Sequence, residues 1–367
     1  MKRFNCIFPG LYNYILTKDV GMIPYKLSGS YDSILTTYPN EEFAYMDNIL
    51  KSKNFKLNYL ENSGNEKKDV IRYIKKNAGN IDILQLYHLR YSQLPYYILS
   101  YKLHNRNGKI YLKLDANNEF VDFLVKRQGI LPTLRRLYVK LLFKFVNLVS
   151  IETNRNYETL LKSKLITEDK LLYLPNGIVE TNTDITRKEH YILYVGYIEK
   201  LNKSIDMLIE AANNIEMKDW KLVLVGDVQE DMKEFIDEIL ENNSQLKEKV
   251  IFKGYISDKE ELSNIYAQSS IYCCTSIKES FGISTLEAAY HGNYIISTNV
   301  GGSPDIIHKT GYGQLITHDI EELEQTLQST IDNWDNIKEN PENIQKKVYD
   351  EFNWDNLCNK IKEKIGD

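Results

Sequence analysis

The sequence has little of what marks several protein classes. Its four cysteines form no Cys-x-x-Cys pair and no Cys/His cluster with zinc spacing, so no zinc site is indicated. Cys6, Cys273 and Cys274 lie in apolar, strand-like runs, where we expect buried, reduced thiols. No segment approaches the roughly 18 consecutive apolar residues of a membrane-spanning helix. Residues 1–10 hold too short an apolar stretch for a signal peptide. We therefore expect a cytoplasmic protein, with peripheral membrane contact still allowed.

A large excess of charge of either sign is also missing. Lys and Arg number 46 against 51 Asp and Glu, and the net charge of −5 argues against a dedicated nucleic-acid binder. The charged fraction of 26% is ordinary and does not indicate disorder. No Asp-x-Asp motif lies between apolar strand segments, and no metal-binding cluster is visible. We therefore expect chemistry that needs neither a metal ion nor a cofactor.

With 367 residues, of which 43% are hydrophobic, the chain can form two domains with separate cores. Short apolar strands alternate with amphipathic helical runs, which predicts parallel sheets covered by helices on both faces. In the first half, strands are expected at residues 4–8, 56–60, 81–86, 109–114, 147–153 and 170–174. In the second half, strands are expected at 191–195, 221–225, 250–253, 271–274 and 293–298.

We therefore predict an α/β protein of two doubly wound, Rossmann-like domains, with a ligand cleft at the carboxyl ends of their strands. The first domain covers residues 1–178 and closes with a Pro-Asn-Gly turn, whose residues favour a sharp reversal of the chain. The second domain covers residues 179–345. An amphipathic helix over residues 346–367 completes the chain.

The most informative segment runs from Glu279 to Glu287. Its two carboxylates lie eight positions apart, and a Phe-Gly turn follows the first. An apolar strand precedes the segment and a helical run, 285–291, ends it, so it forms a strand–loop–helix unit. A helix start offers unpaired backbone N–H groups to an anion. One carboxylate can then meet sugar hydroxyls and the other a ribose, with a diphosphate between them.

This segment resembles the E-x7-E signature of retaining nucleotide-sugar glycosyltransferases of family 4, which have the GT-B architecture. The similarity is specific from about residue 174 to 313 and general before that. It implies two domains that face each other across a cleft, residues 1–178 on the acceptor side and residues 179–345 binding the nucleotide sugar, with the last helix crossing back onto the first domain. It also implies that a hexose moves from a nucleoside diphosphate sugar, expected to be UDP-linked, to a hydroxyl of a bacterial glycan acceptor, for example a polysaccharide repeat unit on a lipid carrier.

The resemblance assigns roles within this segment. Glu287 matches the family glutamate that bonds the ribose hydroxyls, and Glu279 matches the one that bonds a ring hydroxyl of the donor sugar. Phe281, Gly282 and Ile283 match the turn whose backbone N–H groups approach the sugar and phosphate. Glycine fits this turn because a Cβ would block that approach. Taken alone, a glutamate here also fits a helix start stabilised by the helix dipole, and that alternative stays open.

A second donor-binding segment is expected at Gly196 to Ser204, which looks like the family's Gly-Arg loop followed by a lysine. Lys203 matches the lysine that neutralises the departing diphosphate, and Lys200 is its rival. Tyr197 stands where the family carries arginine, so the source of the missing positive charge stays open. Tyr255 is counted with the same donor site.

The first domain gives weaker indications. Gly21 lies where similar enzymes carry a glycine loop near the β-phosphate, although an ordinary turn glycine is the alternative. His88 follows a strand and matches, within one position, the family histidine under the donor sugar. A structural histidine is equally compatible with the pattern. The resemblance thus gives Glu279, Lys203 and His88 as catalytic residues. Asp115 stands in a segment that departs from the family pattern, which puts a catalytic role for it in doubt.

A basic amphipathic helix is expected at residues 133–149. Apolar residues at 134, 137, 141 and 145 share one face at helical spacing. The basic residues Arg135, Arg136, Lys140 and Lys144 lie on the other side. Such a helix either packs on the core with a solvated basic face or lies on an anionic membrane beside the acceptor.

Two other functions stay compatible with the sequence. A GT-B sugar-nucleotide epimerase would turn over its donor without an acceptor. A catalytically dead partner subunit of an active transferase would bind the nucleotide without turnover, and the departures at Tyr197 and Asp115 favour it.

Overall fold

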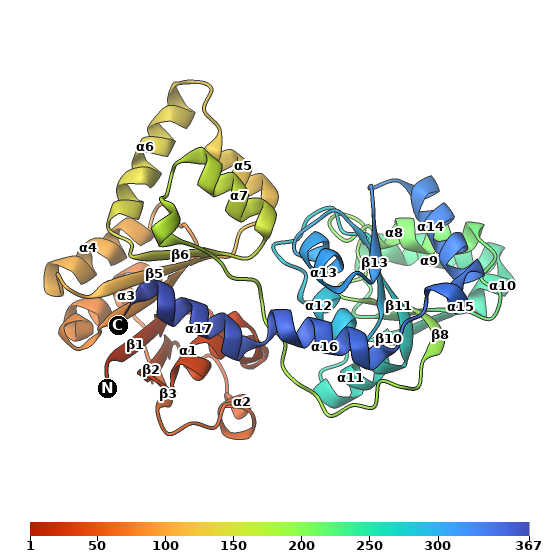
Figure 1. Cartoon of the computed structure of the whole chain (residues 1–367), viewed down its shortest axis with the longest axis horizontal. Coiled ribbons are helices and arrows are strands. Elements are labelled where there is room, and N and C mark those ends of the chain that lie inside the picture. Colours follow the sequence, from red (N-terminus) through yellow and green to blue (C-terminus); the bar gives the residue numbers. More distant parts are fainter. Residues whose placement is uncertain (367) are drawn as a thin grey trace. The chain divides into compact units, whose positions relative to one another are not determined.

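The computed structural model describes residues 1–366 and divides into two compact units. The first unit comprises residues 1–179 and 352–366, and the second comprises residues 180–351. Each unit is a parallel β-sheet covered by helices (Figure 1). This architecture confirms the predicted doubly wound α/β class.

The sheet of the first unit has the strand order β3-β2-β1-β4-β5-β6-β7, with all neighbouring strands parallel. Its strands are β1 (Arg3–Ile7), β2 (Asp32–Thr37), β3 (Phe55–Tyr59), β4 (Ile83–Tyr87), β5 (Lys109–Leu114), β6 (Leu148–Ile151) and β7 (Leu171–Tyr173). Its helices are η1 (Asn13–Thr17), α1 (Asp19–Leu27), α2 (Ala44–Asn48), α3 (Glu66–Asn77), η2 (Ala78–Asn80), α4 (Leu94–His104), α5 (Asn118–Val125), α6 (Ile130–Lys144), α7 (Asn154–Ser163), η3 (Glu168–Lys170) and α17 (Trp354–Ile365).

The sheet of the second unit has the order β10-β9-β8-β11-β12-β13, again parallel. Its strands are β8 (Glu189–Val195), β9 (Lys221–Val225), β10 (Val250–Gly254), β11 (Ser269–Cys274), β12 (Tyr294–Thr298) and β13 (Gly313–Ile316). Its helices are α8 (Ile205–Asn214), α9 (Glu230–Asn242), α10 (Ser244–Lys247), α11 (Lys259–Gln268), α12 (Ile283–Tyr290), α13 (Ser303–Thr310), α14 (Ile320–Asp332), α15 (Trp334–Ile337) and α16 (Pro341–Phe352).

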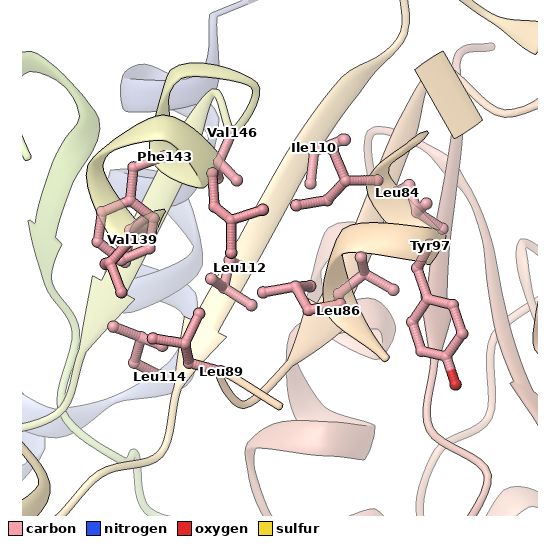
Figure 2. Packing of buried hydrophobic residues seen from close by; sticks show 14 of the residues in the cluster. Leu84, Leu86, Leu89, Tyr97, Ile110, Leu112, Leu114, Val139, Phe143 and Val146 are labelled. Atoms are coloured by element: carbon pink, nitrogen blue, oxygen red, sulfur yellow. The ribbon is translucent and has the colours of Figure 1, made fainter. Parts of the chain in front are cut away.

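Burial on both faces explains why the central strands are nearly continuous apolar runs. Figure 2 shows the packing on one face of the first sheet, where Leu112 of β5 and Leu86 of β4 lie in the same cluster as Val139 and Phe143 of α6. The helices start where polar side chains cap them. Thr153, for example, accepts a hydrogen bond from the backbone N–H of Asn156, at 3.3 Å, at the start of α7.

In each sheet the chain builds outward from a central strand in one direction and then returns to build in the other. We call the place between the two central strands the divergence point. It lies between β1 and β4 in the first unit and between β8 and β11 in the second. The loops that follow those strands lie at the carboxyl edge of the sheet. Open α/β sheets bind their ligands at this place.

The structure corrects the expected elements at several places. Strands β2 and β13 were not predicted. The C-terminal segment is two helices, α16 and α17, separated at Asn353, which caps α17 by accepting a hydrogen bond from Asn356 N at 2.8 Å. Helix α6 ends at Lys144. The later apolar residues of the predicted 133–149 helix lie in β6 or in the short segment that precedes it. Among the described residues, no helix has the length and hydropathy that crossing a bilayer requires.

Candidate functional site

The divergence point of the second unit brings together the two segments singled out in the sequence. The loop after β8 holds Lys203, and the loop after β11 holds Glu279. Hydrogen bonds join the loops, because Thr275 Oγ1 donates to Lys203 O at 2.9 Å and Ile277 N donates to Asn202 O at 2.8 Å. Side chains from both loops are thus fixed over the same edge of the sheet.

Lys203 and Glu279 form an ion pair at this point. Their side chains are 24% and 18% exposed, so the pair is partly shielded from water and open on one side. Ser276 Oγ donates to the same Glu279 oxygen, Oε1, at 2.9 Å. The second carboxylate oxygen of Glu279 and the remaining ammonium protons of Lys203 can therefore meet a ligand.

At the ends of β8, β9 and β10, glycines allow the backbones of neighbouring strands to lie close together. Gly196 N donates to Val225 O at 2.9 Å, and Gly226 N donates to Gly254 O at 2.8 Å. Gly226 has a φ of +140°, and a Cβ on it would lie 1.8 Å from Gly196 O. Only glycine fits this position, which keeps the rim of the site free of side chains.

The start of helix α12 lies beside Glu279. Gly282 precedes it with a φ of +88°, which favours glycine. Phe281 is buried against Gly302, where a Cβ would come within 2.4 Å of the ring, so the turn before the helix is held closely. The N–H groups of Ile283 and Ser284 open the helix and have no carbonyl a turn earlier in it to bond. This is the geometry of an anion site at a helix N-terminus.

Glu287 lies one turn along α12. Its Oε2 accepts a hydrogen bond from the Tyr266 hydroxyl at 3.2 Å. Burial raises the pKa of Tyr266, so the hydroxyl stays protonated and donates. The Tyr266 ring stacks on His291, with centroids 5.5 Å apart and planes 17° apart. The sequence gave no sign of this support for Glu287, because Tyr266 belongs to α11 and the contact depends on how two helices pack.

The two rival lysines have different surroundings. Lys200 Nζ pairs with Asp206 at 3.1 Å, and the lysine side chain is 64% exposed. The structure thus brings Lys203, and not Lys200, to Glu279. Tyr197 and Tyr255 are exposed at the ends of β8 and β10.

The first-unit residues are placed as follows. His88 follows β4 at the other divergence point, with a φ of +59° that is unusual for a residue with a side chain. Burial lowers the pKa of His88. Gly21 was expected in a loop but lies inside α1, where a Cβ would come within 2.1 Å of Leu16 O. Its close packing on η1 explains the glycine, so the expected phosphate-binding loop is absent there.

A buried charge cluster in the first unit was missed entirely. Lys113 is fully buried and pairs with Glu152 at 2.7 Å and with Asp19 at 3.2 Å. Asn176 Nδ2 also donates to Glu152 Oε1, at 2.8 Å. Burial raises the pKa of Glu152. In the sequence Lys113 reads as a charge inside a strand, and nothing local indicates its two partners.

The four basic residues of α6 divide into two pairs. Arg135 donates to Phe123 O and lies over the Phe123 ring, and Arg136 donates to Val125 O and Ser163 O. These two arginines hold the helix to its neighbours, which corrects their assignment to a free basic surface. Lys140 and Lys144 are exposed.

The apolar row of α6 faces away from the protein. The members of this row, which are between 50% and 79% exposed, are Ile130, Leu131, Leu134, Leu137, Leu141 and Phe145. The residues of α6 that pack in the core are instead Val139, Leu142 and Phe143. Helix α6 therefore packs on the core as that alternative expected, but through these three residues and not through the row.

Residues 1–366 contain no group of three or more His, Cys, Asp or Glu side chains that could hold a metal ion.

Comparison with known proteins gives a family match in the second unit. Residues 180–350 match the family model described as Glycosyl transferases group 1. An uncharacterized glycosyltransferase of Methanocaldococcus jannaschii is 26% identical over 209 residues, 52% of each chain. The phosphatidylinositol N-acetylglucosaminyltransferase gpi3 subunit of Schizosaccharomyces pombe is 28% identical over 203 residues, 53% of this chain and 42% of its own. The chain thus matches about half or less of the length of these curated relatives.

A solved structure resembles the whole chain. Anabaena HepE in complex with UDP and glucose has a TM-score of 0.71 at 14% identity, and the match covers 100% of this chain and 99% of HepE. At this level of identity the likeness shows the fold.

Proposed function

We propose that this chain, a group 1 glycosyltransferase with the GT-B fold, moves a hexose from a UDP-linked sugar to a hydroxyl of a bacterial glycan acceptor, with retention and without a metal ion. The observation that carries the proposal is the Lys203–Glu279 ion pair beside the start of α12, at the divergence point of the second sheet. The match of residues 180–350 to the family supports it. The UDP and glucose bound to HepE support the choice of donor.

The residues of the second unit suit each part of the donor. The diphosphate lies at the start of α12, where backbone N–H groups and the helix dipole face it. Lys203 neutralises it as it departs. Glu279 accepts a hydrogen bond from a sugar hydroxyl, and Glu287, oriented by Tyr266, accepts from the ribose. Without a donor, Lys203 and Glu279 neutralise each other.

Retention follows if the acceptor attacks from the face that the diphosphate leaves. The bond from the anomeric carbon to the phosphate oxygen breaks, and its electron pair goes to that oxygen. The acceptor oxygen bonds to the same face of the oxocarbenium-like carbon, and the phosphate oxygen takes the acceptor proton.

The test is turnover of a panel of UDP-hexoses in EDTA, with a bacterial lipid extract as acceptor and NMR of the product anomer. We expect UDP release that depends on acceptor and a product with the anomeric configuration of the donor. Inversion, or a strict need for Mg²⁺ or Mn²⁺, would contradict the proposal. Equal turnover without acceptor would favour the epimerase.

We further propose that the acceptor is presented at an anionic lipid surface by α6. Its exposed apolar row suits insertion at the level of the headgroups. Next to the row, a cavity of about 530 Å³ is rimmed by Lys140, Lys144, Lys164 and Lys170. The first three of these lysines form no ion pair within the described residues, so their charge is available to anionic headgroups. The name of the fission-yeast relative, which specifies phosphatidylinositol, agrees with a lipid acceptor.

Lys164 offers a sharp test of this surface. It ends α7 in the left-handed conformation, with a φ of +58°, where glycine is the usual residue. Lys164→Gly should therefore keep or raise the melting temperature, yet weaken sedimentation with phosphatidylserine liposomes by about 1 kcal/mol.

The matched control is Lys162→Gln on the same helix, because Lys162 already pairs with Glu158 at 3.3 Å. If the wild-type protein fails to sediment even at low salt, the acceptor is not presented by a membrane and a soluble or protein-linked acceptor replaces it.

A further inference from the structure

Directly after Lys203, a residue with a side chain is held in the left-handed conformation. Ser204 is the N-cap of helix α8, with φ and ψ of +48° and +47°. An N-cap serine ordinarily has an extended backbone, and its hydroxyl accepts a hydrogen bond from an N–H of the first helical turn. Within residues 1–366, the Ser204 hydroxyl makes no such bond. The left-handed conformation costs free energy in any residue except glycine, so neighbouring groups have to hold Ser204 in it.

The hydroxyl of Ser204 is bonded to a histidine from a distant part of the chain. His318 Nε2 lies 2.9 Å from Ser204 Oγ, whereas Lys200 O, the other oxygen that this hydroxyl reaches, lies 3.4 Å away. The backbone is held as well, because Ser204 N donates to Lys200 O at 3.2 Å. Thr275 Oγ1 donates to the carbonyl oxygens of Lys203 and Ser204, at 2.9 and 3.0 Å. Each polar group of Ser204 is thus fixed, and His318 is the nearer partner of its side chain.

The loop that carries His318 is fixed on both sides of the histidine. His318 lies between β13 and α14, and Asp319 caps α14 by accepting a hydrogen bond from Glu322 N at 2.9 Å. Glu322 Oε2 accepts in turn from Thr317 N at 2.8 Å. Helix α14 packs beside α8 (Figure 1). The imidazole is therefore presented to the start of α8 in a defined position.

The backbone at Ser204 determines where the side chain of Lys203 points. Helix α8 is anchored in the core of the second unit by Ile205, Leu208 and Ile209. A change of φ or ψ at residue 204 would therefore turn the preceding loop away from the sheet edge. A charge that is held in place before the reaction stabilises a departing anion most effectively, because it does not have to reorganise.

From these contacts we infer that His318 is a positioning residue for the donor diphosphate. It holds Ser204 in the left-handed conformation and thereby directs the ammonium group of Lys203. The inference rests on the proposed function, in which Lys203 neutralises the diphosphate, and adds a residue of the loop between β13 and α14 to it. His318 lies outside both of the donor-binding segments expected from the sequence.

The test is calorimetric titration of the full-length protein with UDP and with UMP. The proteins are the wild type, His318→Ala, Lys203→Ala and the double variant. His318→Ala should weaken UDP binding about five- to tenfold and UMP binding less, because Lys203 acts on the diphosphate. It should add little to the loss in Lys203→Ala, since both changes remove the same interaction. His318→Gln should restore most of the affinity, because the glutamine amide nitrogen can donate to Ser204 Oγ from about the position of Nε2.

A glycine at position 204 separates positioning from direct contact with the nucleotide. Glycine adopts the left-handed conformation without support. In the Ser204→Gly background, His318→Ala should therefore change UDP affinity less than twofold. The control is His308→Ala in α13, where the histidine is also exposed, and UDP affinity should stay as in the wild type.

Three results would each overturn the inference. His318→Ala could bind UDP like the wild type, it could weaken UDP and UMP equally, or its loss could be as large in the Ser204→Gly background or add in full to that of Lys203→Ala. Failure of the proposed function would look different, because the wild type would then not bind UDP, or Lys203→Ala would bind it as tightly as the wild type.

Discussion

At the scale of single residues, three side chains of the second unit have separate tasks in the proposed reaction. Lys203 and Glu279 neutralise each other in the donor-free protein, and Glu287 is held by Tyr266. The positions of these residues, two in loops after strands and one in the helix that follows, could be predicted from the sequence, because the strand–loop–helix pattern fixes them along the chain. Their pairing could not, because the contact between the loops after β8 and β11 arises from the order of strands in the sheet.

The separate tasks can be measured. Glu287→Ala should weaken UDP binding by about 1.5–3 kcal/mol, because a charge-assisted hydrogen bond to the ribose is lost. Tyr266→Phe should weaken it less and should reduce discrimination between UDP and 2′-deoxy-UDP, because it disorders only the carboxylate that meets the ribose. Glu279→Ala should lower turnover more than UDP affinity. Calorimetric titration with both nucleotides checks this, and an equal loss of UDP affinity in the two glutamate variants would show that the assigned roles are wrong.

At the scale of elements, the glycine-ended strands and the start of α12 form the candidate site. Five strands of the second half were predicted closely, and three of the apolar runs, 191–195, 221–225 and 250–253, are followed directly by a glycine. Strand β13, which has only four residues, was not predicted. Strand β2 was missed because Asp32–Thr37 is largely polar by sequence, although it is buried against β1 and β3. Helix α6 was predicted to continue too far, because its apolar spacing runs on into β6 without a break.

The rim of the sheet gives an element-scale prediction. In Gly226→Ala the new Cβ would overlap Gly196 O, so the variant should lose roughly 1–3 kcal/mol of stability and part of its UDP affinity. Gly254→Ala is the control, because Gly254 has a φ of +66° and no heavy atom within 4 Å of the added Cβ. It should lose only about 1–2 kcal/mol from the left-handed backbone. Thermal denaturation with and without UDP measures both, and a smaller effect at Gly226 than at Gly254 would argue against the close-packed rim.

The C-terminal end of α12 predicts a dependence on pH. Burial lowers the pKa of His291 to about 4, and the ring is bonded while neutral, with Nδ1 donating to Glu287 O and Nε2 accepting from Ser263 Oγ at 2.7 Å. As the pH falls, the imidazole is therefore protonated in the unfolded chain before it is protonated in the folded protein. The folded protein loses about 3 kcal/mol of stability as the pH falls from about 6.5 to 4. Burial also lowers the pKa of Lys188 to about 7. This lysine changes the stability with pH only above pH 7, so it does not contribute to the fall below it.

His291→Gln should flatten the fall in melting temperature between pH 7 and pH 4. The exposed His104→Gln change in the first unit is the control and should leave the slope as in the wild type. A parallel slope in the His291 variant would show that this histidine is not buried in its neutral form.

At the scale of the whole molecule, the two units differ in how the chain builds them. The second is a continuous segment, 180–351, whereas the first needs residues 352–366. Trp354, Leu357 and Ile361 of α17 are buried in the core of the first unit, and Lys26 pairs with Asp355 at 2.8 Å. Amphipathicity predicted a terminal helix here, and only the family resemblance indicated where it packs.

A fragment of residues 180–351 should therefore fold and bind UDP, because Lys203, Glu287 and the start of α12, which we propose bind the nucleotide, all lie in it. Truncation before α17 should lower the melting temperature of the first unit and leave UDP binding in place. Differential scanning calorimetry with UDP titration checks both. If the fragment does not bind the nucleotide but residues 1–179 and 352–366 do, the donor site lies in the first unit and the assignment is wrong.

The central claim is that Lys203, at the divergence point of the second sheet, supplies the positive charge that a metal ion supplies elsewhere. The most direct measurement is UDP release from the preferred UDP-hexose in EDTA, for the wild type and for Lys203→Ala and Lys200→Ala. We expect the wild type to keep its rate, Lys203→Ala to lose about a hundredfold or more, and Lys200→Ala to change little. Loss of wild-type turnover in EDTA that Mg²⁺ or Mn²⁺ restores, or an equal loss in the two lysine variants, would contradict the account.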